Sequence, residues 1–242
     1  MNIKQIPFGA AHYFNEEIPK RQIYLHHTAG NDNAAGVFKY WEQTTERVAT
    51  CVVIDSQGLI AQGFSSAKWA YHLGVETKVF NSQGLRYEPL DKLSIGIELC
   101  NWGALTKVGE GEDAKYINYV GREVPADQVT ELKNPYKGFK YWHSYTDAQI
   151  ESVKELLLLW SDKYKIPLDY NEDIWGLTAR ALSAQPGVYT HNSVRKDKTD
   201  VYPHPKLIEM LKSLTAKEPI LVGESKSAAK ESTPKSSAKN KK

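Results

Sequence analysis

The stretch QIYLHHTAG, residues 22–30, ends a short apolar run in two adjacent histidines and a turn of small residues. Successive side chains of a strand point to opposite faces, so Ile23 and Leu25 share one face and His26 lies on the other. His26 and His27 therefore cannot easily bind the same ion, and at most one of them is a metal ligand. The alternative is that both are polar residues at a strand end.

Strands and helices alternate along the rest of the chain. The patterns predict a helix at 34–45, a β-hairpin at 49–64, a strand at 93–102, a helix at 146–164 that begins at Thr146 or Asp147, a strand at 187–191 and a helix at 204–214. Strands interleaved with helices indicate an α/β fold in which helices flank a mixed central β-sheet.

Composition divides the chain into three parts. Residues 1–20 form an N-terminal lead-in without clear periodicity, residues 21–215 form the folded domain, and residues 216–242 form a Lys/Ser/Ala-rich tail that we expect to be disordered. The tail holds seven Lys and three Glu of a chain whose net charge is +2, which leaves residues 1–215 slightly acidic. A nucleic-acid-binding protein should instead carry clustered basic charge on its folded part.

The chain has only two cysteines, Cys51 and Cys100, so no disulfide framework is indicated. Two free, partly buried thiols are favoured over a single bridge. The N-terminus has no long apolar segment, so we expect synthesis in the cytoplasm without a signal peptide. No stretch approaches the roughly 18 apolar residues of a membrane span, so no membrane insertion is expected. A monomer is expected.

A further histidine, His191, ends the predicted strand GVYTH, and Asp200 follows nine residues later. Zinc accepts histidine nitrogen and aspartate oxygen, and a catalytic zinc site often has three protein ligands and one open position. His26, His191 and Asp200 would form such a site if the two strand ends lie side by side. The spacing alone does not establish this arrangement.

A carboxylate lies within the predicted strand LSIGIELCN, residues 93–101. Alternation places the apolar residues on one face and Ser94, Gly96 and Glu98 on the other. Glu98 thus occupies a face that is cleared of bulky side chains. It is either solvated at the sheet surface or it lines a pocket.

Four motifs in this order, IYLHHTAG, AYHLG, LSIGIELCN and THNSVRKDKTD, resemble the zinc-dependent N-acetylmuramoyl-L-alanine amidases of the amidase-2 class. These enzymes share a fold with phage lysozyme-type amidases and peptidoglycan recognition proteins. The resemblance covers roughly residues 23–214, so it makes residues 21–215 an amidase catalytic domain. It implies hydrolysis of the amide bond between N-acetylmuramic acid and L-alanine, in peptidoglycan or in muropeptides.

The resemblance also implies a role for each matching residue. It implies that His26, His191 and Asp200 bind one zinc ion per chain, that Glu98 is the general base, and that Lys198 stabilises the developing oxyanion. It implies that His72, in AYHLG, lines the substrate groove. We interpret His27 as a supporting residue that could also contact the substrate.

The sequence departs from the family pattern at several positions. Cys51 and Tyr71 replace residues that are often histidine and tryptophan, and Asp200-Val-Tyr-Pro203 replaces a common Asp-Pro-Gly. The last change leaves Asp197 as an alternative third ligand. The long aromatic segment 101–145 is either a cover packed on the sheet, which we favour, or a groove wall that contacts the substrate.

Three functions remain open at this point. The chain could be a phage-type endolysin that reaches the cell wall when it is released, which we favour. It could be a cytoplasmic amidase that recycles soluble muropeptides. It could also be a catalytically silent peptidoglycan-binding module, although all four catalytic and ligand positions hold competent residues.

Overall fold

The computed structural model describes residues 1 and 3–215, so the predicted tail at 216–242 lies outside the described residues. Its strands are β1 (Ile3–Gln5), β2 (Gln22–His27), β3 (Val52–Ile54), β4 (Ile60–Gln62), β5 (Ser94–Leu99), β6 (Ala104–Val108), β7 (Lys115–Ile117), β8 (Glu123–Val124), β9 (Val129–Tyr136), β10 (Phe139–His143) and β11 (Gly187–Thr190). Its α-helices are α1 (Ala34–Trp41), α2 (Thr77–Ser82), α3 (Leu90–Leu93), α4 (Asp147–Tyr164), α5 (Ala179–Leu182) and α6 (Pro205–Leu214).

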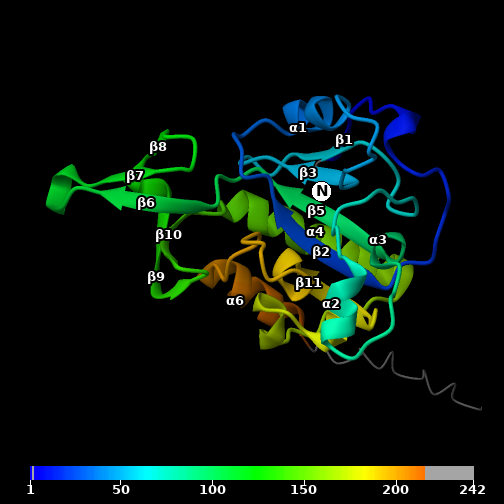
Figure 1. Ribbon diagram of the computed structural model, residues 1–242. Coiled ribbons are helices and arrows are strands. Elements are labelled where there is room, and N and C mark those ends of the chain that lie inside the picture. Colours follow the sequence, from blue (N-terminus) through cyan, green and yellow to red (C-terminus); the bar gives the residue numbers. More distant parts are fainter. Residues whose placement is uncertain (2, 216–242) are drawn as a thin grey trace, which may run out of the picture.

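The central sheet has six strands in the order β1-β4-β3-β5-β2-β11 (Figure 1). The pairs β3–β5, β5–β2 and β2–β11 are parallel, whereas β3 and β4 form the predicted antiparallel hairpin. The sheet is therefore mixed, as predicted. Every residue of β2 is buried, because β2 lies between two parallel strands and both of its faces are covered.

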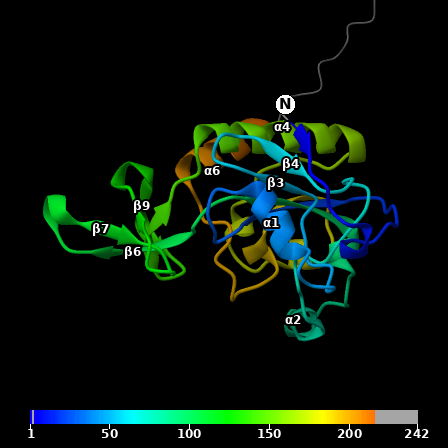
Figure 2. The same cartoon turned by 90° about the horizontal axis from the view of Figure 1, so that it is seen from above.

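Helices cover both faces of this sheet. Helix α4 lies along one face with α6 beside it, and α1 lies on the other (Figure 2). Thr146 is the N-cap of α4, since its hydroxyl accepts from the Gln149 backbone N–H and the Gln149 side chain accepts from the Thr146 N–H. On the opposite face, Phe38 of α1 packs with Val53 and Ala61 in a small second core.

The N-terminal lead-in contributes an edge strand that its short sequence did not predict. Strand β1 pairs in parallel with β4, so that Ile3 lies opposite Ile60. Three residues are too few to show the alternation of a strand. The lead-in thus extends the central sheet by one strand.

The aromatic segment 101–145 forms a sheet of its own, in the order β8-β7-β6-β10-β9, that projects from the domain (Figures 1 and 2). The favoured expectation of a cover packed on the central sheet is therefore wrong. Antiparallel pairing satisfies the backbone hydrogen bonds of these strands within the segment itself. The turn between β9 and β10 uses Lys137 and Gly138, both at positive φ (53° and 86°), which suits a tight hairpin. Part of this segment joins the main core, where Trp142 and Tyr145 are buried.

The two cysteines, Cys51 and Cys100, are free and buried, as favoured. None of the helices in the described part of the chain is both long enough and apolar enough to cross a membrane.

Candidate metal and catalytic site

The candidate site lies at one edge of the central sheet, where three parallel strands end side by side. His26 lies near the end of β2, Glu98 lies near the end of β5, and His191 follows β11 directly. Strand β2 is the middle strand of the three, so the topology brings both neighbours to it. This order fulfils the condition on which the predicted metal site depended.

The structure brings His26, His191 and Asp200 together. His26 Nδ1 lies 3.1 Å from His191 Nδ1 and 3.1 Å from Asp200 Oδ2, and His191 Nδ1 lies 2.9 Å from the same carboxylate oxygen. One ligand atom from each residue falls within 4.8 Å of the others. Two imidazole nitrogens and one carboxylate oxygen form a donor set that suits zinc and leaves a fourth position open.

The protonation states of these residues fit a divalent cation. Burial lowers the pKa of His26 to about 4, although Asp200 opposes this shift, so the ring is neutral at physiological pH. Burial raises the pKa of Asp200, but its hydrogen bonds with His191 and His26 outweigh burial and hold that pKa well below its ordinary value. Neutral imidazole and ionised carboxylate are the metal-binding forms of these groups.

His191 presents a defined nitrogen to the cluster. Its Nε2 lies 2.9 Å from the Leu73 carbonyl oxygen. A carbonyl can only accept, so Nε2 carries the proton and Nδ1 keeps its lone pair. Hydrogen bonds of this kind commonly orient metal-binding histidines.

Glu98 lies opposite His26 in the register of β2 and β5, on the same face of the sheet. Its side chain is partly buried, and burial and the charge of Asp200 raise its pKa well above the ordinary value, while Lys198 opposes them. Of the two readings that the sequence left open, this placement favours the pocket. A carboxylate with a raised pKa beside a candidate metal site is suited to accept and return a proton.

Asp197, the alternative third ligand, lies outside the cluster. Its carboxylate pairs with Arg195, whose Nε lies 3.1 Å from Oδ1, and its side chain is 62% exposed.

The residues after Asp200 explain how the loop holds its position without the common Asp-Pro-Gly. Val201 and Tyr202 are fully buried, and Asn192 Nδ2 donates to the Val201 carbonyl.

Tyr202 fastens the ligand loop to the base of the projecting sheet. Its ring stacks on Trp142 at 4.6 Å and on Tyr145 at 5.0 Å between centroids. Its hydroxyl donates to the His143 carbonyl at 3.0 Å. Sequence reasoning missed this residue, and the only signal was its position two residues after Asp200.

A cavity of about 670 Å³ opens over the cluster of His26, His191 and Asp200. His26, His72, Glu98, His191, Lys198 and Asp200 all border it. Two exposed tyrosines also border it: Tyr40 of α1, 67% exposed, and Tyr119 of the projecting sheet, 71% exposed. Tyr40 belongs to the helix predicted at residues 34–45, and the structure places it on the cavity wall. Tyr119 belongs to the segment whose alternative reading was a groove wall.

The rings of His72 and His27 both make hydrogen bonds within the protein. Both ring nitrogens of His72 are occupied, by His26 Nε2 at 3.0 Å and by Ser94 Oγ at 2.8 Å. The His27 ring lies on the other face of β2, and its Nδ1 is 2.8 Å from the Tyr145 hydroxyl. Both histidines border the cavity described above, and their contact with substrate stays a prediction.

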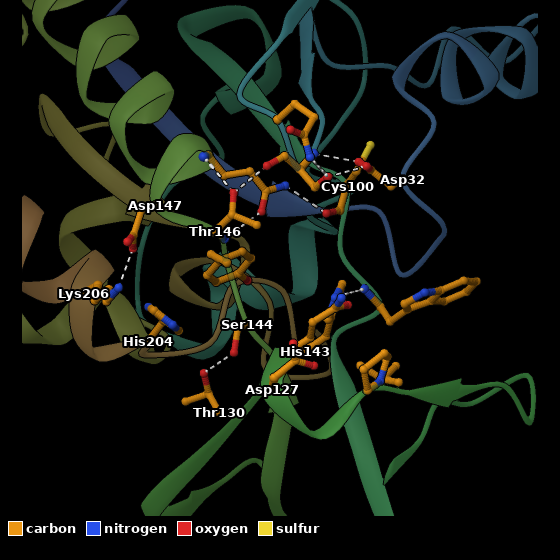
Figure 3. Close-up of a pocket in the computed structure, with 18 of the residues that line it drawn as sticks. Asp32, Cys100, Asp127, Thr130, His143, Ser144, Thr146, Asp147, His204 and Lys206 are labelled. Carbon is orange, nitrogen blue, oxygen red and sulfur yellow. Dashed lines mark hydrogen bonds and ion pairs between the residues drawn. The ribbon is translucent and has the colours of Figure 1, made fainter. Parts of the chain in front are cut away.

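A second cavity, of about 780 Å³, lies between the base of the projecting sheet and the first turns of α4 and α6 (Figure 3). His143, His204 and Asp127 face it, and Asp147 at its edge pairs with Lys206. None of the residues singled out from the sequence as catalytic, metal-binding or substrate-binding borders it. The candidate site residues therefore gather at the cavity over His26, His191 and Asp200.

Residues 16–205 match the family model described as N-acetylmuramoyl-L-alanine amidase. Since this match spans most of the chain, the protein belongs to that amidase family. No curated protein matches the chain.

Solved structures of similar proteins include a mutant of PlyL, which is 16% identical, with coverage of 88% of this chain and 99% of that one at a TM-score of 0.49. AmpD is 16% identical, with coverage of 89% and 95% at a TM-score of 0.49. The amidase LysC from Clostridium intestinale is 13% identical, with coverage of 88% and 96% at a TM-score of 0.47.

Proposed function

We propose that this chain is a zinc-dependent N-acetylmuramoyl-L-alanine amidase that acts on the polymeric cell wall, in the manner of an endolysin. The observation that carries the proposal is the convergence of His26 Nδ1, His191 Nδ1 and Asp200 Oδ2 beside Glu98. The family supplies the reaction class, hydrolysis of the bond between the lactyl group of N-acetylmuramic acid and L-alanine.

His26, His191 and Asp200 would hold the zinc ion. When bound there, zinc lowers the pKa of coordinated water and polarises a carbonyl group. The three side chains differ in what they supply, because the two imidazoles are neutral donors and only Asp200 brings a charge. The site therefore keeps a net positive charge when loaded, which favours negative charge that develops on the substrate carbonyl.

Glu98 would handle the proton. Its carboxylate takes one proton from the attacking water while the water oxygen forms a bond to the carbonyl carbon. The same carboxyl group then returns that proton to the alanine nitrogen as the carbon–nitrogen bond breaks. Its raised pKa makes this return possible at neutral pH.

Lys198 would stabilise the negative charge on the former carbonyl oxygen. It borders the same cavity, and its charge already acts on Glu98 and His26. Removal of one such donor typically slows turnover by about 10²–10³-fold.

Two exposed aromatic rings on the cavity wall support the polymeric wall as the substrate. Tyr40 and Tyr119 border it from different parts of the fold, α1 and the projecting sheet, and both rings are largely exposed. Exposed aromatic rings of this kind provide stacking surfaces for sugars. A recycling enzyme for soluble muropeptides is the alternative.

The decisive experiment compares two substrates with one enzyme preparation. We expect purified zinc-loaded protein to release stem peptide from intact sacculi with a higher kcat/KM per bond than from soluble anhydromuropeptides. The reverse preference would identify a recycling amidase. Tight binding to sacculi without release of stem peptide from either substrate, at full zinc occupancy, would identify a silent binding module.

A further inference from the structure

His72 forms the middle of a hydrogen-bonded chain that begins at a metal-binding histidine. His26 Nε2 lies 3.0 Å from His72 Nδ1, and His72 Nε2 lies 2.8 Å from Ser94 Oγ. Ser94 Oγ lies 2.7 Å from the Leu90 carbonyl oxygen. The chain therefore ends on a backbone acceptor.

The backbone acceptor fixes the direction of every bond in the chain. The Leu90 carbonyl can only accept, so the Ser94 hydroxyl donates its one proton to it. Ser94 Oγ must then accept from His72, which places the proton of a neutral His72 ring on Nε2 and leaves Nδ1 as an acceptor. His72 Nδ1 in turn accepts from His26 Nε2–H, so the lone pair of His26 lies on Nδ1.

That lone pair points toward His191 and Asp200. His26 Nδ1 is the atom that lies 3.1 Å from both His191 Nδ1 and Asp200 Oδ2. Three acceptor atoms at these separations repel one another unless a cation lies among them. The protons placed from the Leu90 carbonyl thus leave the His26 lone pair where the proposed metal site requires it.

The adjacent residues His72 and Leu73 each accept a hydrogen bond from one of the two candidate histidine ligands. The His72 ring accepts from His26, and the Leu73 carbonyl accepts from His191 Nε2 at 2.9 Å. Both backbone N–H groups of this pair donate to Asp91 Oδ1, at 2.8 and 2.9 Å. Asp91 therefore fixes the segment that orders both ligands.

The sequence makes room for the His72 ring at Gly96. A Cβ atom at this position would lie 2.5 Å from Thr50 Cγ2 and 3.1 Å from His72 Nδ1. Gly96 stands between Ser94 and Glu98 on one face of β5. Three alternate residues of β5 thus have related roles. Ser94 accepts from His72, Gly96 leaves space for the His72 ring, and Glu98 is the candidate base.

We propose that His72 and Ser94 are positioning residues, which hold His26 in the tautomer that presents Nδ1 to the metal. This inference rests on the proposed function, because it concerns the same metal site. It gives His72 a role in addition to the predicted one of lining the substrate groove.

The test uses full-length protein with two variants, Ser94→Ala and His72→Phe. Each breaks the chain while leaving the three metal ligands in place. We expect zinc affinity, measured by competition with a chelating dye, to fall by about 10–100-fold, which is typical when a partner of a metal-binding histidine is lost. His72→Gln, whose amide can accept from His26 and donate to Ser94, should recover part of this loss.

The matched control is Ser152→Ala. Ser152 is also a buried serine, and its hydroxyl donates to the Gly58 carbonyl at 2.7 Å in another part of the fold. It should lose a similar amount of thermal stability and keep wild-type zinc affinity. Wild-type affinity in both Ser94→Ala and His72→Phe would overturn the inference.

A second readout separates this inference from the proposed function. Nitrogen-15 NMR of the metal-free protein reports which nitrogen of the His26 ring carries the proton. We expect the proton on Nε2 in the wild type and a shift toward Nδ1 in Ser94→Ala. A proton on Nδ1 of the wild-type ring would overturn the inference even if zinc binds. Failure of the wild type to bind zinc would overturn the proposed function and, with it, the role of these residues toward the metal, while the tautomer measured by NMR would still stand.

Discussion

His26 and Glu98 occupy directly paired positions on the neighbouring parallel strands β2 and β5. Their side chains emerge on the same face of the sheet, so a candidate metal ligand and a candidate base lie next to each other on regular strands. Because both belong to rigid strands, substitution of one should leave the other in position. This independence makes the two roles separable by experiment.

Glu98→Gln tests the role of the base. The substitution keeps the shape of the side chain and removes the proton acceptor, so turnover should fall by about 10²–10⁴-fold while zinc content stays the same. Zinc content and stem-peptide release should be measured on one preparation. Near-normal turnover would show that Glu98 only faces solvent, and loss of zinc would make it a ligand.

His191→Ala tests the metal site. The purified wild-type protein should carry about one zinc ion per chain, and the variant should lose both the metal and the activity, because only two of the three ligands remain. Elemental analysis after dialysis gives the result. Asp197→Ala is the matched control, since this exposed carboxylate lies outside the cluster and pairs with Arg195. Zinc retained in His191→Ala, or lost in the control, would contradict the assigned ligand set.

Tyr202 should affect metal binding although it touches no ligand. Tyr202→Ala removes a fully buried ring that stacks on Trp142, so it should cost about 3–5 kcal/mol of unfolding free energy and weaken zinc binding through the Asp200 loop. Tyr202→Phe loses only the hydrogen bond to the His143 carbonyl, about 1 kcal/mol, and should bind zinc normally.

The control for Tyr202 is Phe80→Ala. Phe80 is also fully buried, but it lies on α2. It should destabilise the fold by a similar amount and leave the zinc affinity of the folded protein unchanged. Equal losses of zinc affinity in both alanine variants would mean that general destabilisation explains the effect.

Tyr119 should contribute to binding of the wall polymer. Tyr119→Ala removes an exposed ring from the cavity wall, so KM for sacculi should rise by roughly 3–10-fold with little change in kcat, the size expected for one aromatic contact. Tyr87→Ala is the comparison, because Tyr87 is 57% exposed and does not border the cavity. Indistinguishable KM values in the two variants would remove Tyr119 from the substrate groove.

His204 should make folding stability depend on pH. Burial lowers its pKa to about 4, against an ordinary value of 6.5, so between these values the unfolded chain binds more protons than the folded one. The stability from this group is therefore complete above pH 6.5 and is lost as the pH falls toward 4, by up to about 3 kcal/mol.

The variant His204→Asn checks this pH dependence. Asparagine can still cap α6, as the His204 ring does by accepting from the Leu207 N–H. Urea unfolding of metal-free protein at pH 7.5 and pH 4.5 should show a smaller difference between the two pH values in the variant. An unchanged difference would show that His204 does not titrate in this window.

Much of the site could be predicted from the sequence because it lies on regular strands. Alternation along residues 22–27 and 94–99 placed His26 and Glu98 on defined faces, and the structure confirms those faces. The order of the strands in space was not readable from any local pattern, and it is this order that brings His191 to His26. The roles of His72 and Leu73 were hidden for a similar reason, because they depend on contacts with Ser94, Asp91 and His191 that are distant in sequence.

The projecting sheet was mispredicted because aromatic content does not distinguish a core from an exposed hairpin. Trp142 and Tyr119 belong to the same segment, yet one is fully buried and the other is 71% exposed. Hydrophobicity alone gave both the same expectation. Trp142 lies on β10, whose register with β9 determines the face on which its ring lies, whereas Tyr119 lies in the connection between β7 and β8.

The stack of Tyr202 on Trp142 has a consequence for anyone who wishes to exchange parts among amidases. The projecting sheet looks like a separate unit, but Trp142 and the His143 carbonyl at its base contact Tyr202 in the loop that carries Asp200. A graft that removed residues 101–145 alone would take away the ring on which that loop rests. A working chimera would have to inherit Val201 and Tyr202 together with the sheet, or restore a self-supporting turn after the aspartate.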